Sequence, residues 1–123
     1  MDGTFSTLAN PIHLEGCEVD YPDNNTNNAL PYLRGLAVDE HGNVFAAGTA
    51  CHSVVKITPE GKVEIVLKAE RPWSPTGVAV HGRDVYVLEY THATEARVKG
   101  WLPRVRKLER DGRVTTLVTV TGE

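Results

Sequence analysis

The residues best suited to chemistry follow an apolar run in the second half of the chain. Glu89 ends the run Val85–Leu88, and His92 comes three residues later. A carboxylate and an imidazole at the end of one strand can act as a general acid–base pair, so Glu89 and His92 are the candidate catalytic residues. Two alternatives stay open for Glu89, namely an exposed strand end and an ion pair with Arg34 or Arg104.

His52 occupies a place in the first half that resembles the place of His92. The two histidines lie 17 and 15 residues beyond Gly35 and Gly77, which begin two similar segments. Together with Glu89, His52 and His92 would offer nitrogen and oxygen ligands to a divalent cation. The alternative is an exposed loop histidine in each case, and no run of Cys and His has the spacing of a structural zinc site.

Four further side chains flank the same apolar runs and are the candidate ligand-binding residues: Arg34, Tyr32, Trp73 and Tyr90. They stand where strands are expected to begin or end, which places them near the same edge as Glu89. Trp73 has a second interpretation, because a tryptophan can also fill a gap between two packed sheets.

An internal repeat positions these residues. Leu33–Val38 returns as Pro75–Val80, and Gly35 and Gly77 are 42 positions apart. Each copy continues through a glycine turn into three further short segments of strand character, about 44–48, 53–57 and 62–67 in the first copy and 84–89, 104–108 and 113–118 in the second. A period in the low forties with four short strands is typical of a β-propeller blade. The sequence therefore predicts an all-β fold of four-stranded antiparallel blades.

The repeat divides the chain into two full blades and a partial one. Residues 33–70 form blade one, and residues 71–120 form blade two with an insertion at 90–101, in which 94–99 is expected to make one or two helical turns. Residues 1–9 parallel the last strand of blade two and are expected to be the outer strand of an incomplete blade, followed by a polar loop at 10–32. Two blades leave sheet faces uncovered, so the expected partners are the remaining blades of a parent propeller or further copies of this chain.

The repeats resemble a known family. Arg34–Phe45 and Val54–Gly61 look like NHL repeats, and Pro75–Val80 resembles the opening of that repeat, although His81 replaces its usual Asp. The resemblance implies a six-bladed NHL propeller, related to gluconolactonase- and regucalcin-like enzymes, to strictosidine-synthase-like proteins and to modules that bind protein or RNA. The expected function is a C-terminal segment of an NHL-type β-propeller acting as a scaffold that binds a small molecule or protein. The alternative is part of a metal-assisted propeller hydrolase or lyase acting on a small molecule.

Composition narrows the partners and the compartment. A net charge of −3 argues against nucleic-acid binding despite a basic stretch at 97–113, and no apolar run reaches the roughly 18–20 residues that span a membrane. Cys17 and Cys51 permit one disulfide, which would indicate an oxidising compartment and an extracytoplasmic parent. Two unrelated buried thiols are the alternative, and they would leave the compartment open.

Overall fold

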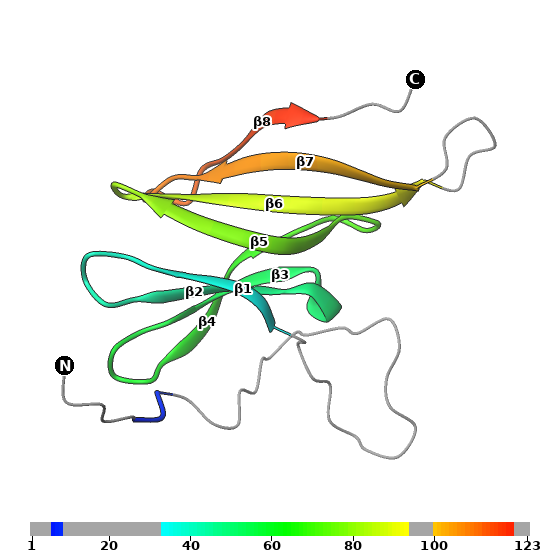
Figure 1. Cartoon of the computed structure of the whole chain (residues 1–123). Coiled ribbons are helices and arrows are strands. Elements are labelled where there is room, and N and C mark those ends of the chain that lie inside the picture. The colour runs from blue at the N-terminus through cyan, green and yellow to red at the C-terminus, as the bar shows by residue number, and fades with distance from the viewer. Residues whose placement is uncertain (1–5, 9–32, 94–99, 120–123) are drawn as a thin grey trace, which may run out of the picture.

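The chain folds into two antiparallel sheets of four strands each (Figure 1). The structure is a computed structural model, and it describes residues 6–8, 33–93 and 100–119. Sheet one consists of β1 (Leu33–Val38), β2 (Val44–Gly48), β3 (Ser53–Ile57) and β4 (Val63–Lys68), with a single 3₁₀ turn, η1 (Thr49–Cys51), between β2 and β3. Sheet two consists of β5 (Ser74–His81), β6 (Asp84–Ala93), β7 (Gly100–Leu108) and β8 (Val114–Thr119). The predicted all-β fold, with four strands in each repeat, is confirmed.

Strand order in each sheet follows the order along the chain, because short turns join consecutive strands. The turn between β1 and β2 shows how the sequence makes such a hairpin. Asp39 Oδ1 accepts hydrogen bonds from the backbone N–H groups of His41 and Asn43, each at 2.9 Å, and Oδ2 accepts one from Asn43 Nδ2 at 2.9 Å. Burial acts to raise the pKa of Asp39, but the Asn43 and His41 hydrogen bonds outweigh it and hold that pKa below its usual value.

The hairpin between β6 and β7 differs from the prediction. Residues 90–93 continue β6 and residues 100–103 continue β7, so half of the predicted insertion at 90–101 lengthens the two strands. Tyr90 pairs with Pro103 and Thr91 with Leu102 in this extension. Of these residues, the aromatic Tyr90 and the β-branched Thr91 favour a pleated strand and support the extension of β6. The predicted helical turns at 94–99 lie outside the described residues.

The outer strand predicted at 1–9 is not seen in the part of it that is described. Residues 6–8 form no strand, and the rest of the segment lies outside the described residues. Residues 6–8 do pass close to sheet one, since a Cβ on Gly61 would lie 2.8 Å from the carbonyl oxygen of Leu8. None of the described residues belongs to a helix long and apolar enough to cross a membrane.

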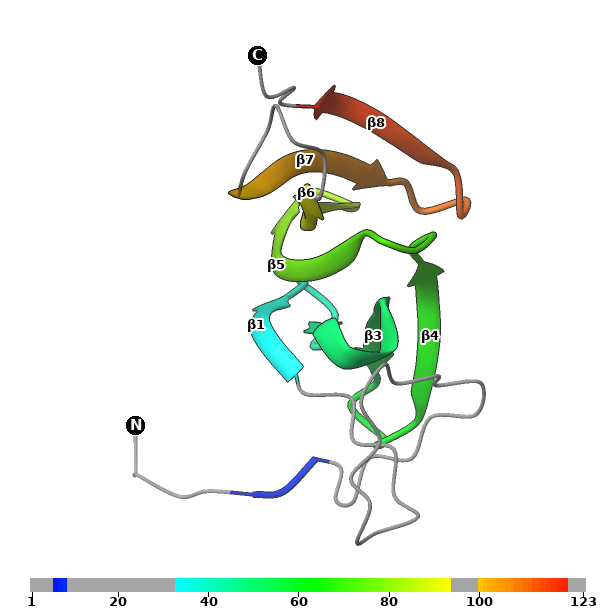
Figure 2. The same cartoon turned by 90° about the vertical axis from the view of Figure 1, so that its right-hand side faces the viewer.

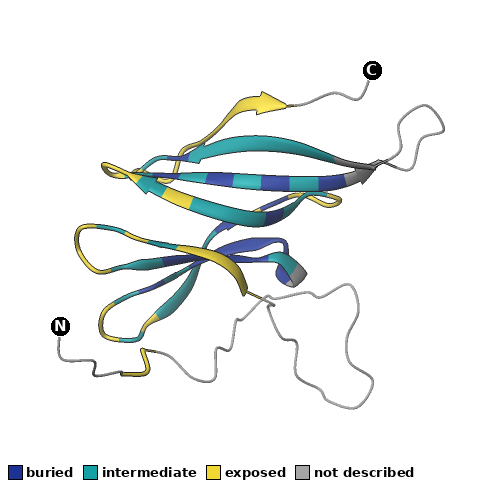
Figure 3. Cartoon of the chain, in the orientation of Figure 1, coloured by how far each residue is buried: buried dark blue, intermediate teal, exposed yellow. Residues whose placement is uncertain are grey.

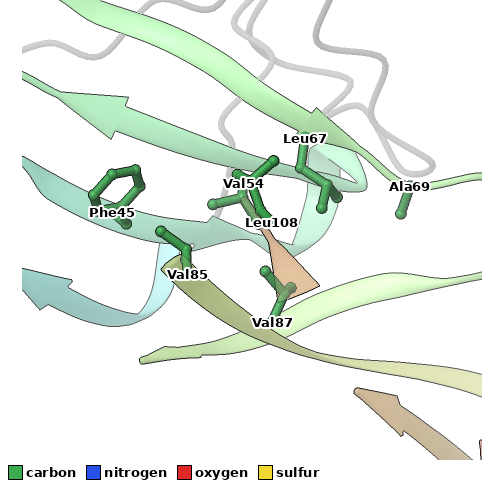
Figure 4. Packing of buried hydrophobic residues seen from close by; sticks show 7 residues of the cluster. All are labelled: Phe45, Val54, Leu67, Ala69, Val85, Val87 and Leu108. Carbon is green, nitrogen blue, oxygen red and sulfur yellow. The ribbon is translucent and has the colours of Figure 1, made fainter. Parts of the chain in front are cut away.

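The hydrophobic core lies between the two sheets. Phe45, Val54 and Leu67 of sheet one meet Val85, Val87 and Leu108 of sheet two, with Ala69 from the connecting segment beside them (Figure 4). Burial is greatest along the middle strands, whereas β8 and the turns at 40–42, 59–60, 81–83 and 110–113 are exposed (Figure 3). Full burial of a side chain of this size contributes about 1.5–3 kcal/mol, so this contact is the main force that holds the sheets together.

The inner strands β1 and β5 approach each other closely, as the turned view shows (Figure 2). Gly35 has a φ of 56°, and a Cβ there would lie 3.1 Å from the Thr76 carbonyl oxygen and 3.2 Å from the Gly77 Cα. Both strands carry a register shift next to this glycine pair, between Arg34 and Leu36 in β1 and between Pro75 and Gly77 in β5. Gly35 is therefore required by the close approach of the two backbones, whereas a Cβ at Gly77 would make only ordinary contacts with Leu88 at 3.6 and 3.8 Å.

Candidate functional site

Glu89 is the most buried charged residue of the predicted site. It lies on β6, on the face that β6 turns toward sheet one, and its side chain is fully buried at 0% exposure. Oε2 accepts hydrogen bonds from Arg104 Nε and Arg106 Nε, both at 2.7 Å, and Oε1 accepts one from Arg106 Nη2 at 3.0 Å. Both carboxylate oxygens are thus engaged by guanidinium groups.

The strand register produces this cluster. Glu89 is directly opposite Arg104 on β7, and Arg106, two residues further along β7, shares the same face of the sheet. The Arg104 guanidinium also stacks over the Trp73 ring, with 4.1 Å between Cζ and the ring centroid. The two arginine side chains are only 15% and 16% exposed. This geometry is the ion pair between Glu89 and Arg104 that the sequence analysis gave as an alternative, and Arg106 is a second cationic partner of the same carboxylate.

His52 links the first sheet to the segment that enters the second. It ends η1 with a φ of 54°, a left-handed conformation that costs a residue with a side chain about 1–2 kcal/mol. Its Nδ1 lies 2.9 Å from the Trp73 carbonyl oxygen and 3.1 Å from Ser74 Oγ. Because a carbonyl oxygen only accepts, Nδ1 carries the proton in the contact with Trp73. A second link nearby is the hydrogen bond from Thr49 Oγ1 to the Pro75 carbonyl oxygen at 2.8 Å.

The other candidate ligand-binding residues are not gathered into one site. Arg34 is exposed on the edge strand β1, and Tyr90 is half-buried on the face of β6 opposite to that of Glu89. Tyr32 and the side chain of His92 lie outside the described residues. The structure therefore brings Trp73, Glu89 and His52 into one region between the sheets, and it leaves Arg34 and Tyr90 apart from them.

Two further predictions stay open. Among the described side chains, no three His, Cys, Asp or Glu are grouped so as to hold a metal ion, and since the described side chains do not include His92, the divalent cation stays a prediction. Cys51 is buried and disulfide-bonded, whereas Cys17 lies outside the described residues, so the pairing of these two also stays a prediction.

A cleft of about 390 Å³ opens between the sheets at the end that carries the hairpin turns, the opposite end from Glu89. Its floor is apolar and consists of Phe45, Val66, Val80, Val85 and Leu108. Its rim consists of polar side chains from the hairpin turns and from β3, namely Asp39, Glu40, His41, Asn43, Lys56, Arg83, Glu109 and Arg110. An apolar floor with a few polar groups at the rim is the usual composition of a small-molecule site.

Two arginines at the rim of the cleft have no ion pair with the described residues. Glu109 lies 3.7 Å from Arg113 and 3.9 Å from Lys107. Glu40 lies 3.6 Å from His41, a contact that is an ion pair only when the imidazole is protonated. Both carboxylate oxygens of Asp39 accept hydrogen bonds from Asn43 within their own turn. Arg83 and Arg110 are exposed, and within the described residues neither has an ion pair.

Sequence reasoning missed this cleft because it placed function at the other end of the strands. The available signal was an arginine within two residues of the glycine in two hairpin turns, Gly82–Arg83 and Arg110–Gly112. That both arginines face one space depends on how the sheets stack, which the repeat pattern alone does not give.

Compared with known proteins, the chain matches no protein-family model, and no curated protein matches it at a significant level. The resemblance to NHL repeats accordingly stays a prediction. The structural basis for a function is the geometry of the cleft and of the surroundings of Glu89, which lie at opposite ends of the two sheets.

Proposed function

We propose that this chain is a segment of an NHL-type β-propeller that serves as a binding scaffold, and that its cleft binds a small organic anion with an apolar body. The observation that carries the proposal is the cleft itself, with its apolar floor and two arginines that form no ion pair with the part of the chain that the structure describes. Its volume of about 390 Å³ falls within the range of small-molecule sites, roughly 300–1,000 Å³.

The chemistry of the ligand follows from the lining. Phe45, Val80 and Leu108 would cover an aromatic or aliphatic body and remove its surface from water. Arg83 and Arg110 would each donate hydrogen bonds to a carboxylate, sulfonate or phosphate at the rim, since a planar guanidinium matches the geometry of such groups. The preferred ligand therefore carries an anionic group at one end of an apolar body.

Glu89 lies at the opposite end of the sheets from the cleft, and its surroundings argue against acid–base catalysis by its carboxylate. A general base must be able to reach a proton on its substrate. Both oxygens of Glu89 already accept hydrogen bonds from Arg104 and Arg106, and its side chain has no exposed surface. The carboxylate is better placed to hold two strands and two sheets together than to meet a substrate.

The proposal can be tested with 8-anilinonaphthalene-1-sulfonate, an apolar fluorescent anion. The test variant is Arg83→Glu/Arg110→Glu, and Arg34→Glu/Lys62→Glu is a control with the same change in net charge and substitutions outside the cleft. An exposed ion pair contributes about 0.2–1 kcal/mol, and two charge reversals add repulsion, so we expect the test variant to bind about tenfold more weakly.

The control should bind the probe as the unmodified chain does. Equal weakening by both variants would show that net charge alone attracts the probe. No weakening by either would place the bound probe outside the cleft, and both results contradict the proposal.

A further inference from the structure

The rim of the cleft is divided between the two sheets. Its sheet-one side includes the turn between β1 and β2, which carries the carboxylates of Asp39 and Glu40. Its sheet-two side includes the turn between β5 and β6, which carries Arg83, and the turn between β7 and β8, which carries Arg110. All three turns lie at the same end of the sheets, at the left of Figure 1. The two sides of the rim thus carry charges of opposite sign.

Ion pairs within each sheet offset the other charges of the rim. On the sheet-one side, Lys56 Nζ lies 3.9 Å from Glu64 Oε1. On the sheet-two side, Glu109 lies 3.9 Å from Lys107 and 3.7 Å from Arg113. With these pairs counted, the sheet-one side stays negative and the sheet-two side stays positive.

Glu40 is the carboxylate that a ligand can reach on the negative side. Both oxygens of Asp39 already accept hydrogen bonds from Asn43, so Asp39 contributes its charge rather than a binding group. The side chain of Glu40 is 68% exposed. Among the described residues, its ion-pair contact is with the His41 imidazole 3.6 Å away, which is charged only when protonated. Beside a neutral imidazole, the Glu40 carboxylate can accept hydrogen bonds from a cationic group of the ligand.

The separation of the two sides sets the length of a ligand that meets both. Stacked sheets lie about 10 Å apart. The two charges of a single α-amino acid, which one Cα joins, are too close together to span that distance. An extended peptide spans at most about 3.3–3.6 Å per residue, so about three residues reach from one side to the other. The floor beneath such a peptide is apolar and includes Phe45, Val80 and Leu108.

We propose that the cleft binds a short apolar peptide with free ends, its carboxylate at Arg83 and Arg110 and its amino group at Glu40. Each guanidinium would donate hydrogen bonds to the terminal carboxylate, and the terminal ammonium would donate them to the Glu40 carboxylate. The apolar side chains of the peptide would cover the floor and lose their contact with water. This inference rests on the proposed function, and it narrows the ligand from an organic anion to a zwitterion.

The test compares three forms of one peptide, alanyl-phenylalanyl-alanine, which are the free peptide, the N-acetylated peptide and the C-amidated peptide. Binding to the full chain is measured by titration followed by heteronuclear NMR, which also shows whether the shifted amide resonances belong to residues of the cleft. N-acetylation removes the cationic end, and C-amidation removes the anionic end. We expect each change to weaken binding about two- to fivefold, the equivalent of one exposed ion pair.

The Glu40→Gln variant then identifies the partner of the amino group. It should bind the free and the N-acetylated peptide equally, because the carboxylate that distinguishes them is gone. Glu60→Gln is the matched control, since Glu60 is exposed in the turn between β3 and β4 and does not line the cleft. The control should keep the preference for the free peptide. Both substitutions are at exposed side chains, and unchanged resonances away from the turns would confirm that the variants fold.

Three results would overturn the inference: equal binding of the free and the N-acetylated peptide by the unmodified chain, a preference that persists in Glu40→Gln, or no shift of cleft resonances with any peptide. The proposed function is decided separately by 8-anilinonaphthalene-1-sulfonate and the Arg83→Glu/Arg110→Glu variant. If that probe binds in the cleft and the peptides fail, the cleft is a site for anions and not for peptides. If the probe also fails, the proposed function and the inference are both wrong.

Discussion

Replacement of Glu89 by Gln tests whether the buried carboxylate holds the structure together. Gln has nearly the same shape, but it carries no charge and presents an NH₂ group to a site filled with donors. The carboxylate of Glu89 is 0% exposed and accepts hydrogen bonds at 2.7, 2.7 and 3.0 Å. Arg104 and Arg106 would keep their charges after the substitution and would lose their counter-ion.

The expected loss in the free energy of unfolding follows from the burial of the Glu89 carboxylate and of the Arg104 and Arg106 guanidinium groups. Removal of one partner from a buried ion pair destabilises a protein by about 3–5 kcal/mol, because the remaining charge stays buried without compensation. Arg104 and Arg106 retain 15% and 16% of their exposure, so some water can reach them, and we expect a loss at the lower end, about 3 kcal/mol. A chain of this size has about 5–15 kcal/mol of total stability, so the loss is large.

Urea denaturation followed by circular dichroism is the appropriate assay, since urea is uncharged and does not screen the ion pairs. With a slope of about 1–3 kcal/mol per molar urea, a loss of 3 kcal/mol lowers the midpoint by about 1–3 M. Glu64→Gln is the control, because Glu64 is 42% exposed and lies 3.9 Å from Lys56. That pair should contribute less than about 1 kcal/mol. If Glu89→Gln and Glu64→Gln shift the midpoint equally little, the cluster is not a structural element and the reasoning is refuted.

Two smaller perturbations test the local geometry by the same assay. Asp39→Ala should lower the free energy of unfolding by about 1–2 kcal/mol at pH 7, because three hydrogen bonds are lost. Since the pKa of Asp39 is lowered in the folded state, this loss should be complete above the ordinary pKa of 3.8 and should shrink as the pH falls through the folded-state pKa. A loss that does not change with pH would contradict the prediction. Gly35→Ala should destabilise the chain more than Gly82→Ala, since both have positive φ but only Gly35 has backbone atoms at 3.1 and 3.2 Å from the added Cβ; equal losses would show that β1 can move away from β5.

Strand positions were predictable from the sequence because local features set them. Glycine turns and alternating apolar residues gave the bounds of β2 and β3 as the structure has them. The extension of β6 and β7 was not predictable in the same way, because it depends on the pairing between the two strands and not on an alternating pattern within either one. Local signals fix where a strand begins more reliably than how far its pairing continues.

The partners of Glu89 were predictable only in part. Arg104 was one of two candidate partners, but Arg106 was not considered, although residues two apart on a strand share a face. Choosing between Arg34 and Arg104 required the register of β6 against β7. The cleft was less predictable than the ion pair, because its floor combines residues of two sheets and the stacking of the sheets arises from tertiary packing.

Comparison of the two repeats shows what the Glu89 cluster is for. The positions of Glu89 and Arg104 are held in sheet one by Gly48 and Ser53, which pair with each other in the same register, and the position of Arg106 is held by Val55. Sheet one forms its four strands without these charges, so the cluster is not needed to make a sheet. It faces sheet one and stacks on Trp73 of the connecting segment, which assigns it to the junction between the sheets.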